Sequence, residues 1–60
     1  MTDCELVQML SDGYRVIEIS VEKSINKRTL EKRILVLRER CVCKTVTNLV
    51  ANYLRRGLIK

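Results

Sequence analysis

The sequence predicts an all-α fold of four short helices, at residues 3–12, 16–23, 27–41 and 47–56. Apolar residues recur at helical spacing along the chain, capping residues precede three of these segments, and a glycine follows the first and the last. Sixty residues form one domain, and a chain of this length buries only about 60% of the surface that it exposes when unfolded. The chain has no Phe or Trp, so its core must be mainly aliphatic.

The first predicted helix has clear signals at both ends. Thr2 and Glu5 have the spacing of a capping box, in which each residue binds the backbone N–H of the other. Gly13 is placed to end the helix in a left-handed conformation. The apolar residues between these signals are Leu6, Val7, Met9 and Leu10.

The segment 16–23 has two possible interpretations. Residues 17–22 alternate between apolar and polar, which is typical of a half-buried strand, and residues 41–47 also have strand-like composition. A two-stranded ribbon is therefore an alternative, but such a ribbon is only marginally stable by itself. As a helix, the segment places Val16 and Ile19 on one face, and we expect the helix.

The helix at 27–41 is the segment around which the rest is organised. Asn26 can cap its first turn. A narrow apolar stripe follows at helical spacing, made by Leu30, Ile34, Leu37 and Cys41. The other face is polar and mostly basic, with Arg28, Thr29, Lys32, Arg33, Glu39 and Arg40. A DNA-recognition helix needs this division, because one face packs on a core while the other enters the major groove.

The last helix, at 47–56, is capped by Thr45 or Thr47 and ends at Gly57, after which residues 58–59 fold back. It has a broad apolar side formed by Val46, Leu49, Val50, Tyr53 and Leu54. The brief helix 16–23, the turn 24–26 and the longer basic helix 27–41 together describe a helix-turn-helix.

Charge is distributed unevenly along the chain, whose net charge is +5. Residues 1–22 carry one Arg against five acidic residues, whereas residues 23–44 carry eight Lys or Arg against two Glu. This concentration favours a surface that binds a polyanion. We expect no enzyme activity, since the chain has no His and no Gly-rich phosphate loop, and no membrane span.

Three cysteines, Cys4, Cys41 and Cys43, make an odd count without any His, so we expect neither a complete zinc site nor another cofactor. Cys41 lies on the apolar stripe and is best interpreted as a small buried residue. A redox or metal motif at Cys41-x-Cys43 is the alternative. Three free thiols suit a reducing cytoplasm, where we expect the protein.

The chain resembles the DNA-binding domain of LuxR/GerE-type transcription regulators, a four-helix helix-turn-helix module. The resemblance covers nearly all 60 residues without a gap. It rests on Thr2-x-x-Glu5, Gly13, Glu18-Ile19-Ser20, Ile25-Asn26-x-x-Thr29-Leu30, Leu37-x-x-Arg40-Cys41 and the closing Arg55-Arg56-Gly57-Leu58-Ile59. The chain differs from the family at Arg33, where a His is characteristic, and at Glu31 and Val36, where a basic residue and Asn are frequent.

The resemblance implies sequence-specific binding of double-stranded DNA in transcription regulation, with helix 27–41 in the major groove. Thr29 and Lys32 would then lie near base edges. The residues directed towards phosphates would be Lys27, Arg28, Arg33 and Lys44. Leu35 and Val36 lie towards the same side and could contact thymine methyl groups, or they could be tolerated surface residues or part of a protein contact.

The apolar side of helix 47–56 spans more than one neighbour needs, so we expect a weak homodimer through Val50, Tyr53 and Leu54. Two other functions stay open. One is a protein-interaction module that modulates another regulator or the transcription machinery, which Glu31 and Val36 favour. The other is a small RNA-binding or polyanion-binding protein, against which the shortage of aromatic residues argues.

Overall fold

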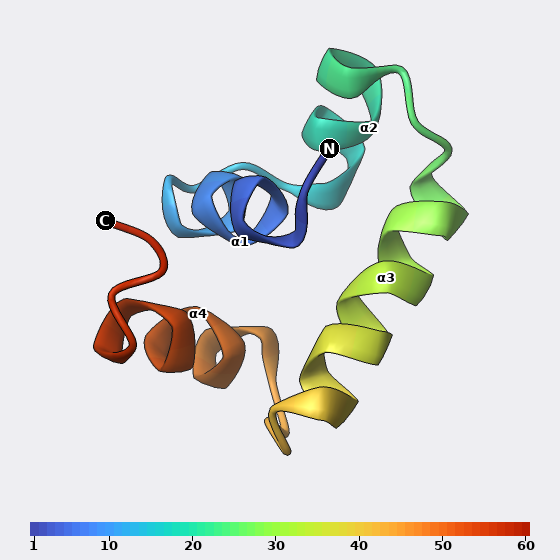
Figure 1. Cartoon of the computed structure of the whole chain (residues 1–60). Helices are drawn as coiled ribbons and strands as arrows, with labels where there is room; N and C mark the ends of the chain where they lie inside the picture. The colour runs from blue at the N-terminus through green and yellow to red at the C-terminus, as the bar shows by residue number, and fades with distance from the viewer.

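In the computed structural model, which describes residues 1–60, the chain forms four α-helices and no strand (Figure 1). They are α1 (Asp3–Ser11), α2 (Val16–Lys23), α3 (Lys27–Arg40) and α4 (Val46–Arg55). The prediction of an all-helical domain is confirmed, and each predicted boundary lies within one residue of the observed one. None of these helices combines the length and the apolar character that crossing a membrane requires.

The alternative of a two-stranded ribbon is wrong, because residues 17–22 lie within α2 and residues 41–45 form the connection to α4. Local capping explains part of this outcome. Glu18 accepts a hydrogen bond from the backbone N–H of Arg15 at 2.8 Å. This contact stabilises the start of α2, although the side chain of Arg15 has no acceptor with which to cap the helix. The helix buries Ile19 completely and leaves Ile17 and Val21 exposed.

All four helices end in the same way, with a residue in the left-handed conformation. The N–H groups of this residue and the next one donate to carbonyls three and five residues back, as Tyr14 does to Met9 at 3.0 Å. The left-handed residues are Gly13, Ser24, Val42 and Gly57, with φ of 96°, 53°, 54° and 71°. The chain therefore reverses within short connections, at residues 12–15, 24–26 and 41–45.

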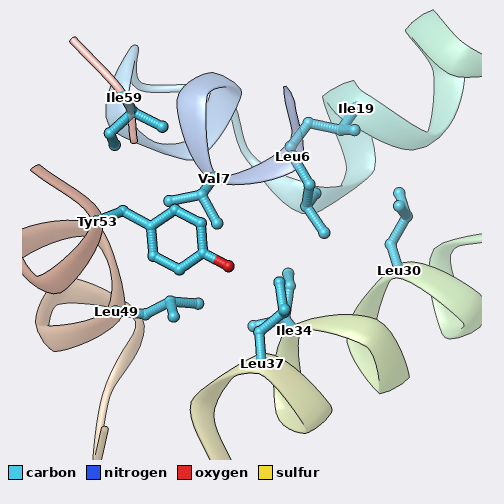
Figure 2. Close-up of a cluster of buried hydrophobic side chains, with 9 residues drawn as sticks. All are labelled: Leu6, Val7, Ile19, Leu30, Ile34, Leu37, Leu49, Tyr53 and Ile59. Atoms are coloured by element: carbon cyan, nitrogen blue, oxygen red, sulfur yellow. The ribbon is translucent and has the colours of Figure 1, made fainter. Parts of the chain in front are cut away.

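The core lies between the four helices and consists entirely of buried apolar side chains. Both α1 and α3 pack against α2 and α4, and Figure 2 shows side chains from all four helices converging on the space between them. The nine core residues are Leu6, Val7, Ile19, Leu30, Ile34, Leu37, Leu49, Tyr53 and Ile59. Because no charged or polar residue is buried, every Lys and Arg stays at or near the surface.

The segment after α4 folds back, as the sequence predicted, and the structure shows that it does so onto α1. Ile59 completes the core, while Leu58 stays 42% exposed. The amide of Gln8 binds the backbone of Lys60 twice: Oε1 accepts from the N–H at 2.9 Å, and Nε2 donates to the carbonyl at 3.0 Å. Gln8 thus holds the segment that carries Ile59 against the first helix.

Candidate nucleic-acid interface

Helix α3 is fixed in place by its cap and by its apolar face. Oδ1 of Asn26 accepts a hydrogen bond from the backbone N–H of Arg28 at 2.8 Å, which confirms the predicted N-cap. The buried face consists of Leu30, Ile34 and Leu37, and Cys41 is half-buried just after the helix. The orientation of α3 is therefore set by packing, and the side opposite the core is open to solvent.

Most of the predicted DNA-binding side chains lie on the open side of α3 or just beyond its end. The exposed ones are Lys27, Arg28, Thr29, Lys32, Val36 and Lys44. A helix of 14 residues is about 21 Å long, so Lys27 and Lys44 mark opposite ends of this surface. We call these six residues together with Arg33 the basic face of α3.

An open hollow of about 470 Å³ lies beside α3, towards the start of α1. Of the predicted residues it brings together Thr29, Lys32, Arg33 and Val36, whereas Lys27, Arg28 and Lys44 lie outside it. Its full lining is Asp3, Thr29, Lys32, Arg33, Val36, Leu37 and Arg40. Three cations and one carboxylate thus surround a space that is open to solvent.

Three lining residues were not among the predicted site residues: Leu37, which belongs to the core, and the charged residues Arg40 and Asp3. Arg40 lies seven residues after Arg33 and four after Val36, so helical spacing alone could have placed it on the same side. Asp3 comes from the first turn of α1, and no local pattern links it to α3. Its position in the hollow depends on how α1 and α3 sit in the folded chain.

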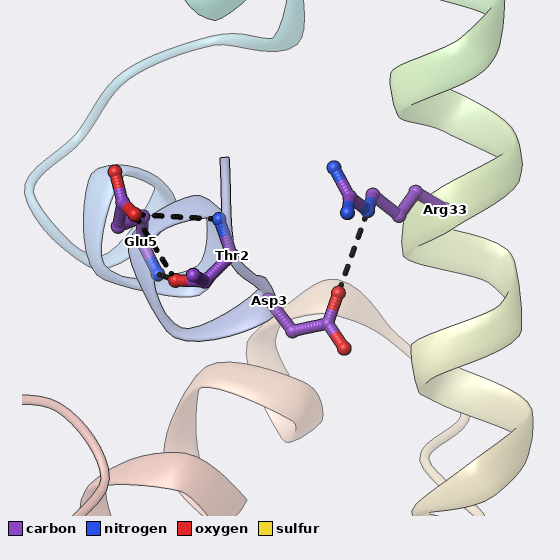
Figure 3. A network of polar contacts seen from close by, with 4 residues as sticks. All are labelled: Thr2, Asp3, Glu5 and Arg33. Carbon is purple, nitrogen blue, oxygen red and sulfur yellow. Dashed lines mark hydrogen bonds and ion pairs between the residues drawn. The ribbon is translucent and has the colours of Figure 1, made fainter.

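Arg33 is the one predicted phosphate contact that is partly occupied within the chain. Its Nε lies 3.4 Å from Oδ1 of Asp3, and each side chain is 38% exposed (Figure 3). Ion pairs between exposed side chains are weak, so this contact can be exchanged for another.

Arg38 is basic but does not belong to the basic face. Its Nε donates to the carbonyl of Cys43 at 3.4 Å, and Nη2 donates to the carbonyl of Lys44. The guanidinium thus binds the connection that follows α3 and satisfies carbonyls there. The exposed side chain of Lys44 is held near the end of α3 as a result.

One residue of the predicted dimer contact, Tyr53, is not available for it. Tyr53 is 7% exposed and belongs to the core, where burial raises the pKa of its hydroxyl, so its side chain is not offered to a second copy. Val50 is half-buried and Leu54 is 44% exposed. Together with Val46, which is 37% exposed, they form an apolar line at positions i, i+4 and i+8 of α4.

The cysteines form no disulfide, and no group of three or more Cys, Asp or Glu side chains is placed to hold a metal ion. Cys4 is exposed, whereas Cys41 and Cys43 are half-buried. Burial is the main cause that raises the pKa of the Cys43 thiol, which donates to the carbonyl of Cys41 at 3.5 Å. A raised pKa lowers the thiolate fraction and thus the reactivity of Cys43.

No protein-family model, no curated protein and no solved structure matches the chain. The surface of α3, the fold that presents it and the local sequence patterns are therefore the features from which a function can be inferred.

Proposed function

We propose that the chain binds double-stranded DNA sequence-specifically, as the DNA-binding domain of a transcription regulator, with α3 in the major groove. The observation that carries this proposal is the division of α3 between a fully packed apolar face and an exposed basic face. A helix with its side chains is about 10–12 Å across, and the major groove of B-DNA is about 12 Å wide. The exposed side of α3 therefore suits the groove in both shape and charge.

Helices α2 and α3 would form the helix-turn-helix of a LuxR/GerE-type domain. Two observations support this assignment: α2 packs against α3, and only residues 24–26 connect them. The turn is held by Ser20, whose hydroxyl donates to the carbonyl of Ile25 at 2.5 Å. The sequence resemblance described above supports the same assignment.

The residues of the basic face divide into two roles. Thr29 and Lys32 would lie near base edges, where Lys donates to the O6 and N7 atoms of guanine, and Val36 would contact a thymine methyl group. The phosphate contacts would be Lys27, Arg28, Arg33 and Lys44. Phosphate contacts fix the register of the protein on the duplex, and base contacts supply the specificity.

We further propose a weak homodimer through Val50 and Leu54 of α4, which is strengthened when two half-sites on DNA hold the protomers together. The reducing cytoplasm suits three free thiols and is the compartment that we propose.

The direct test is a selection of bound duplexes from a random-sequence pool. Enrichment of one motif supports the proposal, and a two-fold symmetric motif also supports the dimer. Retention of duplexes without enrichment, equal to that of single-stranded RNA, overturns sequence-specific DNA binding in favour of general polyanion binding.

One observation favours a second function, a protein-interaction module that modulates another regulator. Leu35 and Val36 are 49% and 46% exposed on α3, and Glu31 adds a negative charge to the same helix. For this function the Leu35→Ala variant would lose binding to the partner regulator, whereas Lys32→Ala would not. If the chain instead binds DNA, Lys32→Ala would weaken duplex binding more than Leu35→Ala does.

A further inference from the structure

The single ion pair of the structure joins α1 to α3 at the open hollow beside α3. Nε of Arg33 and Oδ1 of Asp3 are 3.4 Å apart, and both residues line the hollow. In Figure 3 the side chain of Arg33 extends from α3 towards the start of α1 and meets the carboxylate through Nε. The structure records no hydrogen bond from the two terminal nitrogens of this guanidinium.

The position of Asp3 is built into the fold. Asp3 is the first residue of α1, and the capping box on either side of it fixes the first turn. The backbone N–H of Glu5 donates to Oγ1 of Thr2 at 3.2 Å, and the N–H of Thr2 donates to Oε1 of Glu5 at 3.3 Å (Figure 3). The backbone of Asp3 is therefore held at the edge of the hollow, where its carboxylate lies beside Arg33.

The Asp3 carboxylate would oppose the binding of a DNA phosphate in two ways. Carboxylates and phosphates are both anions that a guanidinium can bind, so a phosphate contact by Arg33 through Nε requires that Asp3 release that atom. The carboxylate also shares the hollow with Lys32 and Arg40, where its charge repels a phosphate. The fraction of exposed surface, 38% for each partner, makes the ion pair weak enough to be exchanged.

We propose that Asp3 is an internal competitor of the DNA backbone for Arg33, and that it lowers the affinity of the domain for DNA. This inference rests on the proposed function and adds a regulatory residue that lies outside the recognition helix. Binding of DNA would transfer Arg33 from the carboxylate to a phosphate. Neutralising Asp3 would remove both the competition and the repulsion, and would strengthen binding.

The test compares Asp3→Asn with Asp12→Asn. Both substitutions remove one negative charge from the α1 region, but Asp12 follows the other end of α1 and forms no ion pair. Asn keeps the shape of Asp in each case. Affinity for a short duplex of mixed sequence is measured by fluorescence anisotropy over a range of salt, and the Nε–H signal of Arg33 is followed by NMR in the free proteins.

We expect Asp3→Asn to bind about fivefold more tightly than Asp12→Asn at low salt, since about fivefold corresponds to the upper range of an exposed ion pair. The difference should shrink as salt rises, because salt screens exposed charges. The Arg33 Nε–H signal should shift in Asp3→Asn and stay in place in Asp12→Asn.

Two results overturn the inference. If the wild type binds the duplex and both variants bind equally, Asp3 does not compete for Arg33 and the proposed function still stands. If neither the wild type nor any variant binds duplex DNA, the proposed function fails, and the inference fails with it.

Discussion

At the scale of single residues, two non-glycine residues at the ends of helices adopt the left-handed conformation, which residues other than glycine rarely adopt. Ser24 and Val42 have φ of 53° and 54°, in the left-handed region where Gly13 and Gly57 also lie. A left-handed conformation costs an L-residue roughly 1–2 kcal/mol, and a β-branched side chain such as that of Val42 makes it still less favourable. The left-handed conformation of Val42 therefore lowers the stability of the fold at the connection after α3.

We expect Val42→Gly to raise the free energy of unfolding by about 1 kcal/mol, because glycine adopts the left-handed conformation without strain, although it gains some entropy when unfolded. Little packing is lost, since Val42 is 90% exposed. Urea unfolding followed by circular dichroism measures the change. Gly13→Ala is the converse control and should destabilise by about 1 kcal/mol; stabilisation of the protein by both changes would contradict this explanation.

The capping box of α1 makes stability depend on pH. The backbone N–H of Thr2, and secondly its side-chain hydroxyl, hold the pKa of Glu5 below its ordinary value of 4.5. A depressed folded-state pKa gives stability that is fully present above the unfolded-state value and is lost as pH falls through the folded-state value.

We therefore expect the wild type to lose stability relative to Glu5→Gln as pH falls below 4.5, until the two unfolding curves converge in acid. Thermal unfolding at a series of pH values measures this difference. The exposed Glu22, which accepts no such hydrogen bond, supplies the control Glu22→Gln. If Glu22→Gln changes the acid dependence as much as Glu5→Gln does, the capping box is not the cause.

At the scale of helices, the function that we propose depends on a difference between α3 and α4. Both helices carry exposed basic residues, but those of α3 are distributed from its first residue to its last, whereas Arg55 and Arg56 lie at the end of α4. A diffuse electrostatic attraction would use both groups equally. Docking of a recognition helix would use only the first.

Arg33→Ala should lower the slope of log K against log salt by about one and weaken binding to all duplexes similarly, as expected for one lost phosphate contact. Lys32→Ala should instead reduce the preference for the selected site by about 1–3 kcal/mol. Titrations of a selected and an unselected duplex over a range of salt measure both effects. Arg55→Ala is the control, and an effect equal to that of Arg33→Ala would refute docking through α3.

The apolar line on α4 gives a second prediction at this scale. Leu54→Lys should reduce the cooperativity of binding to a duplex with two half-sites by about tenfold, which corresponds to about 1.4 kcal/mol, and leave binding to one half-site almost unchanged. Leu58→Lys is a matched control, because Leu58 is 42% exposed and Leu54 is 44% exposed. Sedimentation that finds a single protomer on the two-site duplex for the wild type would argue against the dimer.

At the scale of the whole molecule, nine buried side chains hold four helices together, so each contributes a large share of the stability. A domain of 60 residues has a free energy of unfolding of roughly 3–9 kcal/mol, from about 0.05–0.15 kcal/mol per residue. Truncating one fully buried Leu to Ala costs about 2–5 kcal/mol. A single core truncation can therefore remove most of the stability.

Leu30→Ala should leave the domain largely unfolded, or folded only at low temperature. The reason is that Leu30 of α3 is completely buried in the core. Leu35→Ala, on the same helix but 49% exposed, should cost less than about 1 kcal/mol. Circular dichroism melts of the two variants check this contrast. Equal losses would mean that Leu35 takes part in a buried contact, as it would in a dimer through α3.

The sequence by itself determined the four helices, their ends and the basic side of α3. These features depend on interactions within a few residues, such as the capping box of Thr2 and Glu5 and the cap at Asn26. For α2, whose alternating pattern also suits a strand, the local contact between Glu18 and the backbone of Arg15 explains part of the outcome.

Only the tertiary structure decided which side chains from different helices meet. Asp3 and Arg33 are 30 residues apart, and Gln8 and Lys60 are 52 apart. Tyr53 belongs to the same apolar side of α4 as Leu54, yet it is buried while Leu54 is exposed. Helical periodicity fixes the direction of a side chain relative to its own helix, whereas its surroundings depend on how the helices pack, which no single segment encodes.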